Sequence, residues 1–348
     1  MLTSGQYIGG DILHVLSQAH PDYEVTILAR AREKADTVKQ AYPKVRIVIA
    51  DLDDSDALKQ EAQKADVVIH TADASDHEGA AKALIAGLLE GHNKENPGFY
   101  LHTGGTGILT WEDAETGNLG QWSEKQYNDW EGVGDLTSLP DSAFHRNVDK
   151  IVLEAGETHG DVVKTALVCP PTIYGKGTTP GFDGFLGTGR GPLSSRSRQV
   201  YELASLILSA KYIPIIGEGK ARWDNVHVWD LSQVYVLLTE AAVSQRLDPE
   251  IWGPQGYILA GAGEHSWSDI AAKIAKEAEN KGYVPSLEKR SLSREAALEQ
   301  AGFQAESWGL NSRGRSERAE RVLGWNPSAP SLEETLPEIV DQEYKRQH

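Results

Sequence analysis

The sequence predicts an α/β protein with a doubly wound parallel sheet and a smaller C-terminal lobe. Two observations lead to this fold class. Short apolar, β-branched runs alternate with segments whose apolar residues recur at helical spacing. The runs are apolar throughout, as strands are when helices cover both faces of a sheet.

Five runs are expected to form the buried strands. They cover residues 24–29, 45–50, 65–70, 98–103 and 164–169, and turn residues bound each of them. Helical spacing of apolar residues precedes or separates these runs, near residues 8–16, 80–88 and 148–155. The loop-rich stretch 175–198 is expected to end the first unit and begin the smaller lobe.

Composition and net charge limit the kinds of partner that the chain is expected to bind. The chain has 348 residues and a net charge of −17, which argues against nucleic acid or an anionic membrane as the main partner. No apolar run approaches the ~20 residues of a bilayer-spanning helix, and no secretory signal opens the chain. The single cysteine, Cys169, excludes an internal disulfide and fits a reducing cytosol, so a cytoplasmic location is expected.

Function is expected at the carboxyl ends of the strands, where doubly wound sheets bind ligands. Arg30 follows the run 24–29, at the tip that faces the adenosine ribose in a dinucleotide fold, and no acidic residue stands there. Arginine accommodates a 2′-phosphate, so NADP is favoured over NAD. Asp51 and Leu52 follow the next run as adenine contacts, and no metal site is expected because the acidic stretch 51–56 lacks the glycine of a calcium loop.

Six segments in a fixed order resemble the extended short-chain dehydrogenase/reductase superfamily. They read YIGG, ADLDDSDAL, ADVVIHTA, YLHTGGTG, CPPTIYGKG and DNVHVWDLSQVYVLL. More narrowly, they are similar to NAD(P)-binding epimerase/dehydratase-like and NmrA-like proteins. The resemblance implies a Rossmann-like NAD(P)-binding domain over residues 1–175. Residues 176–348 would mainly form the substrate lobe, with about 211–243 returning to the Rossmann core.

The resemblance also indicates where catalysis should lie. This family uses a tyrosine as general acid/base, with a lysine one helical turn later and a Ser or Thr at the preceding strand tip. Lys150 matches the lysine, but the tyrosine position holds Arg146, and none of the twelve tyrosines precedes a lysine by four residues. His145 is the nearby side chain that can transfer protons near neutral pH. Thr106 is the expected hydroxyl donor, although its alignment with the family is ambiguous.

The remaining cofactor contacts are carried over from the family's motifs. They are Gly5, Tyr7, Ile8 and Gly9 in the opening turn, Ala72 and Thr103 at strand tips, Lys150, and Pro170, Thr172 and Ile173 in the loop near the nicotinamide. Aligned on YIGG, the chain has only Met1 and Leu2 ahead of the turn. The central first strand is therefore expected to be missing, and Gln6 stands where the family has a glycine.

Three hypotheses remain open at this point. The chain is an NAD(P)-dependent oxidoreductase or epimerase-like enzyme whose sequence begins too late, acting on a small carbonyl, hydroxyl or sugar-nucleotide compound. Alternatively, it is a non-catalytic NmrA-like dinucleotide sensor or interaction module, or a decayed chain that binds cofactor poorly. Related enzymes often pair through helices, so a homodimer is an open expectation.

Overall fold

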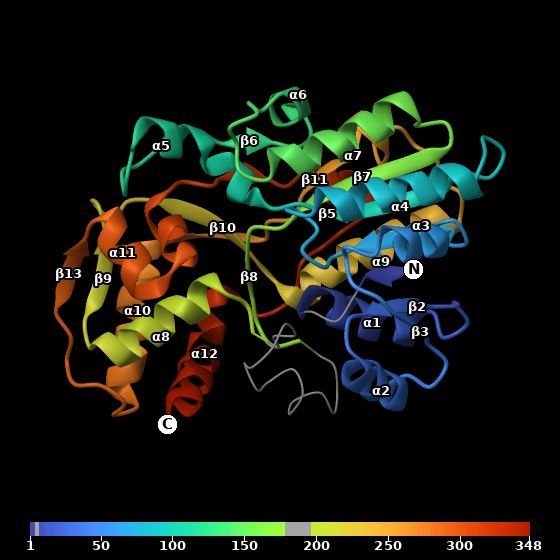
Figure 1. Ribbon diagram of the computed structural model, residues 1–348. Coiled ribbons are helices and arrows are strands. Elements are labelled where there is room, and N and C mark those ends of the chain that lie inside the picture. Colours follow the sequence, from blue (N-terminus) through green and yellow to red (C-terminus); the bar gives the residue numbers. More distant parts are fainter. Residues whose placement is uncertain (4–6, 178–195) are drawn as a thin grey trace.

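A computed structural model describes residues 1–3, 7–177 and 196–348. Figure 1 shows two lobes, with the large sheet and its helices on one side and α8, α10, α11 and α12 on the other. Within the described residues, no helix combines the length and the apolar character that a membrane crossing requires.

The large lobe is built on a seven-stranded sheet in which every pairing is parallel. Its order is β11 (Tyr257–Leu259), β7 (Val163–Cys169), β5 (Gly98–Thr103), β4 (Val67–His70), β1 (Leu2–Thr3), β2 (Thr26–Ala29) and β3 (Arg46–Ile49). The five strands expected from the sequence are all present. The order 3-2-1-4 at the dinucleotide-binding end is that of a Rossmann-like, doubly wound sheet, which confirms the predicted fold class.

The centre of the sheet differs from the expectation of a missing first strand. Leu2–Thr3 form a two-residue strand between β2 and β4, in register with Ile27 and Leu28 on one side. The amino group of Met1 donates to the carbonyl of Val67 at 2.6 Å. Burial lowers the pKa of this amino group to about 5. Two residues therefore supply the ladder that the sequence did not lead us to expect.

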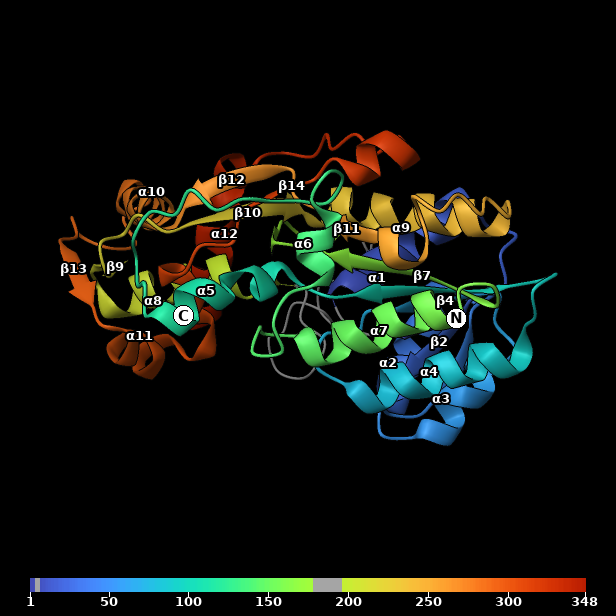
Figure 2. The same ribbon diagram turned by 90° about the horizontal axis from the view of Figure 1, so that it is seen from above.

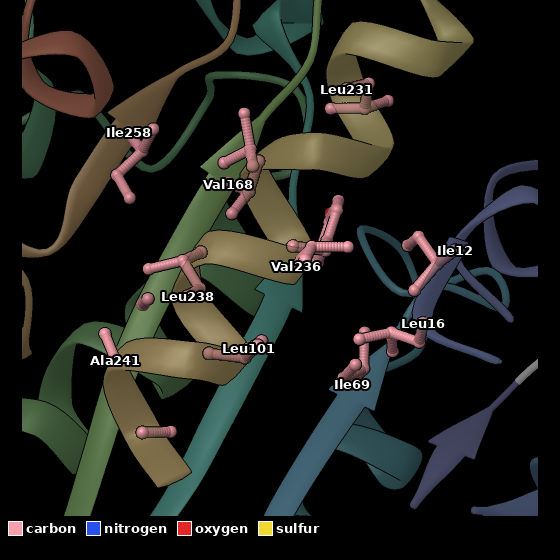
Figure 3. Close-up of a cluster of buried hydrophobic side chains, with 14 of the residues drawn as sticks. Ile12, Leu16, Ile69, Leu101, Val168, Leu231, Val236, Leu238, Ala241 and Ile258 are labelled. Carbon is pink, nitrogen blue, oxygen red and sulfur yellow. The ribbon is translucent and has the colours of Figure 1, made fainter. Parts of the chain in front are cut away.

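Helices cover both faces of the large sheet. One face carries α1 (Tyr7–Ala19), α2 (Arg32–Ala41) and α9 (Val228–Val243), and the other carries α3 (Ser55–Ala62), α4 (Glu78–Gly91) and α7 (Arg146–Thr158). Figure 3 shows Leu231, Val236 and Leu238 of α9 lying across the strands that carry Leu101 and Val168. This burial of continuous apolar strands on two faces is what the sequence pattern predicts.

The smaller lobe has a core of its own. It is formed by α8 (Gln199–Ala210), α10 (Trp267–Asn280) and α12 (Leu332–Gln347), with α11 (Arg294–Ala301) beside them. β9 (Ile213–Ile216) pairs with β13 (Lys289–Leu292) in parallel. Figure 2, seen from above, shows this lobe beyond the ends of the strands of the large sheet.

Short elements join the two lobes. β10 (Arg222–His227) lies between β8 (Thr172–Tyr174) and β12 (Gly263–Ser266), and β6 (Tyr127–Asn128) pairs with β14 (Gly314–Arg315). The segments α5 (Trp111–Thr116), α6 (Val133–Thr137), η1 (Thr106–Thr110), η2 (Gly253–Gln255), η3 (Phe303–Gly309) and η4 (Ala319–Leu323) are short helical turns.

Residues 211–243, the segment expected to return to the Rossmann core, contribute to both lobes. Their second half, α9, packs against the large sheet, whereas β9 belongs to the core of the smaller lobe. β11, outside the expected segment, also returns and forms the edge of the large sheet beside β7. Periodicity alone does not reveal this, because a three-residue strand leaves little pattern to detect.

Candidate active site

A cavity of about 810 Å³ lies at the carboxyl end of the large sheet. Residues that follow four neighbouring strands line it: Tyr7 after β1, Thr71 after β4, Gly104 after β5 and Pro170 after β7. The smaller lobe closes the opposite side through residues of η3 and the start of α8. A cavity in this place is where a doubly wound sheet binds its ligands.

His145 reaches the cavity from the residue just before α7. Its backbone is left-handed, with φ of 69°, a conformation that histidine adopts more readily than most residues with a side chain. Its Nδ1 lies 2.7 Å from Oδ1 of Asp76, in the loop between β4 and α4. Its other ring nitrogen, Nε2, faces the strand-tip loop, where a Cβ on Gly105 or Gly107 would lie 3.4 Å away.

Asp76 holds His145 through a carboxylate that stays charged. Burial opposes the charge of Asp76, but hydrogen bonds from His145 and Ser75 lower the pKa of the carboxyl below its ordinary value. A carboxylate on one ring nitrogen fixes the imidazole orientation and stabilises its protonated form. The pair therefore places an oriented imidazole among the residues that line the cavity.

Asp149 lies one helical turn after His145, on the buried face of α7. Only 1% of its surface is exposed, and it accepts a hydrogen bond from the Tyr257 hydroxyl at 2.9 Å. Its other oxygen, Oδ1, has no hydrogen-bond partner among the described residues. Burial raises the pKa of this carboxyl to about 6.

Lys150, the expected partner of the catalytic group, points elsewhere. Half of its side chain is exposed, and its ammonium pairs with Asp141 at 2.8 Å. It does not line the cavity. Its place on the solvent side of α7 gives no support to the expected contact with cofactor or substrate.

Two expected hydroxyl groups do reach the cavity. Thr106 is 2% exposed, and its Oγ1 has no hydrogen-bond partner among the described residues. Thr103 instead shares a hydrogen bond of 2.5 Å with the Tyr235 hydroxyl of α9. Since an unpaired buried hydroxyl is costly, Thr106 Oγ1 is poised to bind a ligand oxygen.

Several expected cofactor contacts line the same cavity. Tyr7 and Ile8 begin α1, and Pro170 and Ile173 follow β7. Thr172 is fully buried beside them, and its hydroxyl has no described partner.

Other expected contacts lie outside the cavity lining. Gly9 is buried within α1, Leu52 packs against the core beneath α3, and Ala72 is half-buried after β4. Asp51 accepts hydrogen bonds from the backbone amides of Asp53 and Asp54, which gives it a role in the turn. Gly5 lies outside the described residues.

The tip of β2 carries a group of exposed cations. Arg30 and Arg32 are exposed, and Lys34 is half-buried beside them. Partial burial, and then the neighbouring Arg30 guanidinium, lower the pKa of Lys34. Like charges held this close favour an anion between them.

Sequence reasoning missed Asp76, Asp149, Phe144 and Phe303. Asp76 follows the tip of an expected strand, and Asp149 follows His145 by one helical turn, so position and spacing could have pointed to both. Phe144 precedes His145, and its ring centroid lies 3.6 Å from that of the imidazole. Phe303 comes from η3 in the smaller lobe, and no motif marks it.

A second group of histidines lies deeper, beneath α4. His70 Nδ1 lies 2.8 Å from the Tyr100 hydroxyl, which lies 3.1 Å from Nδ1 of His102. All three side chains are fully buried. Burial lowers the pKa of His70 to about 3 and also lowers that of His102, so both imidazoles are neutral.

Three features of the cavity are compatible with a bound dinucleotide. The strand ends converge on the cavity, the loop after β5 presents Gly104 and Gly105 without side chains, and Thr106 offers an unpaired hydroxyl. In the described part of the chain, no group of three His, Cys, Asp or Glu side chains is placed to hold a metal ion.

Comparisons with known proteins agree with this geometry. Residues 5–127 match the model of the NAD(P)H-binding family. The chain is 34% identical over 346 residues to the oxidase ucsJ of Acremonium sp., covering 98% of this chain and 95% of that protein. An uncharacterized protein of Saccharomyces cerevisiae, YLL056C, is 25% identical over 342 residues and 94% of its length.

Solved structures share the fold at low identity. The dTDP-glucose 4,6-dehydratase DesIV of Streptomyces venezuelae, with NAD and TYD bound, is 15% identical, with a TM-score of 0.65 over 99% of this chain and 96% of that one. The UDP-glucose 4-epimerase of Thermotoga maritima, with UDP-glucose, is 14% identical, with a TM-score of 0.63 over 99% of this chain and 98% of that one. The chain therefore belongs to the family of the oxidase ucsJ, with an NAD(P)H-binding region over residues 5–127, and its fold is that of extended short-chain dehydrogenase/reductase dehydratases and epimerases.

Proposed function

We propose that the chain is an NADP-dependent oxidoreductase that interconverts a carbonyl and a hydroxyl group on a small molecule. The observation that carries the proposal is the His145–Asp76 pair at the cavity, with Nδ1 on the carboxylate and Nε2 beside the lining residues Gly105 and Gly107. The oxidase relative supports a redox reaction.

His145 replaces the family's tyrosine without needing a lysine. A phenol has an ordinary pKa near 10 and needs a nearby ammonium before it can exchange protons at neutral pH, whereas an imidazole titrates near 6.5. This difference accounts for a lysine at position 150 that faces solvent and pairs with Asp141.

The reaction divides into a hydride step and a proton step. When bound, the nicotinamide supplies or accepts the hydride. Thr106 Oγ1 donates a hydrogen bond to the substrate oxygen. In reduction, Nε2 of His145 gives its proton to that oxygen, and in oxidation the neutral ring takes it back, while Asp76 stabilises the charged ring.

The cations at the tip of β2 support NADP over NAD. Arg30 and Arg32 are exposed at the place where a dinucleotide fold meets the adenosine ribose, and Lys34 lies next to Arg30. A 2′-phosphate between these cations would relieve their mutual repulsion. Arginine can also bind a phosphate through two parallel hydrogen bonds.

Titration of the purified chain with NADPH and NADH, followed by cofactor fluorescence, tests the cofactor assignment. NADPH should bind at least about tenfold more tightly than NADH. Arg30→Ala should weaken NADPH about tenfold and leave NADH nearly unchanged. The control Lys276→Ala, an exposed cation on α10, should alter neither. Failure of both cofactors to bind overturns the proposal.

The variant His145→Gln distinguishes the enzyme hypothesis from the hypothesis of a non-catalytic sensor. The variant should bind NADPH as the wild type does, but its NADPH-dependent reduction of an aromatic aldehyde should be at least about a hundredfold slower. Asn147→Gln, on the exposed side of the same helix, serves as the control. Cofactor binding without hydride transfer in the wild type would favour the non-catalytic sensor, for which the missing tyrosine is the supporting observation.

A further inference from the structure

We infer that the substrate is an uncharged compound with a flat apolar group, which rests on Phe144 and Phe303, and that it is not a nucleotide sugar. The inference rests on the proposed function, because it names the substrate of the same cavity. The charges and the exposed apolar surface of the described lining residues carry it.

Phe144 and Phe303 form an aromatic wall at the cavity. Phe144 is 40% exposed and Phe303 is 57% exposed, whereas Phe99, the third phenylalanine among the described residues, is 1% exposed. Their ring centroids lie 5.3 Å apart at an angle of 53°. One comes from the larger lobe and the other from η3 of the smaller lobe, and both line the cavity.

Covering this wall with a ligand is favourable for two reasons. Exposed apolar surface gains free energy when it leaves water, and aromatic rings add a preference for other rings at such distances. The wall lies against the proton-transferring group, since the Phe144 and His145 ring centroids are 3.6 Å apart. A flat group on the wall thus places its carbonyl beside His145.

Other lining residues extend the apolar surface. Trp223 lines the cavity on the side of the smaller lobe, and its indole nitrogen already donates to the Leu310 carbonyl at 2.6 Å. The ring is 5% exposed and has no donor left for a polar ligand. Ile173 and Leu310 also line the cavity.

The charged side chains at the cavity do not suit the diphosphate of a nucleotide sugar, which would come in addition to that of the cofactor. A dinucleotide fold holds the cofactor's own diphosphate on the backbone amides of its first turn. Among the described lining residues, the cationic side chains are Arg196 and Arg198. Arg196 is bound to two carboxylates, Glu202 at 2.8 Å and the buried Glu343 at 2.7 Å. A diphosphate carries about two negative charges and is normally held by several free cations.

Carboxylates weigh further against an anionic substrate beside the cofactor. Asp73, Asp76 and Glu306 line the same cavity. Glu306 is paired with Arg294, but Asp76 is needed by His145, and its charge persists. Arg198, exposed at the start of α8, is then the single lining cation of the described chain that is not engaged by a carboxylate.

Two probes test the inference without relying on turnover. The full chain is titrated with 2-naphthaldehyde, an uncharged aromatic carbonyl, and with UDP-glucose, with tryptophan fluorescence as the signal. Both titrations are run with and without NADPH. The variants are Phe303→Ala, which is remote from His145, Phe303→Trp, which keeps an aromatic ring, and the control Leu247→Ala, an exposed apolar residue outside the cavity.

We expect 2-naphthaldehyde to bind saturably and Phe303→Ala to weaken it about five- to tenfold. Phe303→Trp should bind it within about twofold of the wild type, and Leu247→Ala should have no effect. UDP-glucose should show no saturable binding. Saturable UDP-glucose binding overturns the inference, as does absent naphthaldehyde binding or equal binding by Phe303→Ala. NADPH binding is measured separately. Absent NADPH binding would contradict the proposed function, whereas absent naphthaldehyde binding with intact NADPH binding would contradict the role of Phe144 and Phe303.

Discussion

His70 and His145 place the same imidazole group in two contrasting settings of one fold. His70 is fully buried beneath α4, where the Tyr100 hydroxyl is its side-chain partner, and His102 completes the group. His145 is partly exposed at the cavity and is held by the Asp76 carboxylate. The first environment offers no charge to balance a proton, and the second does.

The comparison shows how burial decides what an imidazole can do. Desolvation lowers the pKa of His70 to about 3, so that it remains neutral and serves as a hydrogen-bonding core residue. A carboxylate and access to ligand give His145 the two conditions that proton transfer requires. Four experiments test this contrast.

The largest expected effect is on acid stability. The fold favours neutral His70, so the stability it contributes is present above pH 6.5 and is lost as the pH falls towards about 3. Between pH 7 and pH 4 this loss corresponds to about 3 kcal/mol. His70→Gln should unfold with a pH dependence weaker by about that amount in urea titrations, whereas the control His159→Gln, at an exposed site, should behave as the wild type.

Asp149 should show the opposite pH dependence. The fold favours its protonated form, so the stability from this group is complete below pH 3.8 and is lost as the pH rises to about 6. Asp149→Asn removes the buried charge and should raise the free energy of unfolding at pH 8 by about 2 kcal/mol, with little change at pH 4. Equal changes in the free energy of unfolding at both pH values would show that folding does not raise the pKa of the Asp149 carboxyl.

Asp76→Asn tests the partner that distinguishes His145 from His70. Asparagine can still accept a hydrogen bond but carries no charge, so the imidazolium loses its stabilisation. We expect kcat for reduction to fall roughly tenfold, a modest loss because Asp76 is 47% exposed. An unchanged kcat would mean that the carboxylate does not support the charged ring.

Lys150→Ala should have the smallest effect. The side chain pairs with Asp141 at the surface, so kcat/KM and NADPH affinity should remain within about twofold of the wild type. A loss of tenfold or more in kcat/KM or NADPH affinity would show that Lys150 acts at the site, as the lysine of the family does. It would also contradict the division of roles between His145 and Lys150 drawn from the structure.

Much of the fold was predictable because its signals are local. Five apolar runs became strands, and the spacing of Val148, Val152 and Ala155 marked the buried face of α7. That same spacing places Asp149, three residues before Val152, on the buried side and leaves Lys150 outside. The family alignment argued for Lys150 as a site residue, whereas the periodicity of this chain places it on the solvent side of α7.

The site was less predictable because its geometry depends on long-range contacts. The left-handed backbone of His145 has no sequence signature, and Asp76 reaches it from 69 residues away. Phe303 comes from a different lobe altogether. The two-residue β1 was also missed, since Leu2–Thr3 are too few to show a strand pattern.

The loop after β5 constrains how this site could change. A Cβ on Gly104 would lie 2.9 Å from the sulfur of Cys169 and 3.2 Å from Oδ1 of Asp149. A hydroxyl-bearing residue at position 104 is therefore penalised in the present background, first by Cys169 and Leu167 and then by Asp149. Position 104 is coupled to all three neighbours, so a serine at this strand tip requires changes at more than one of them.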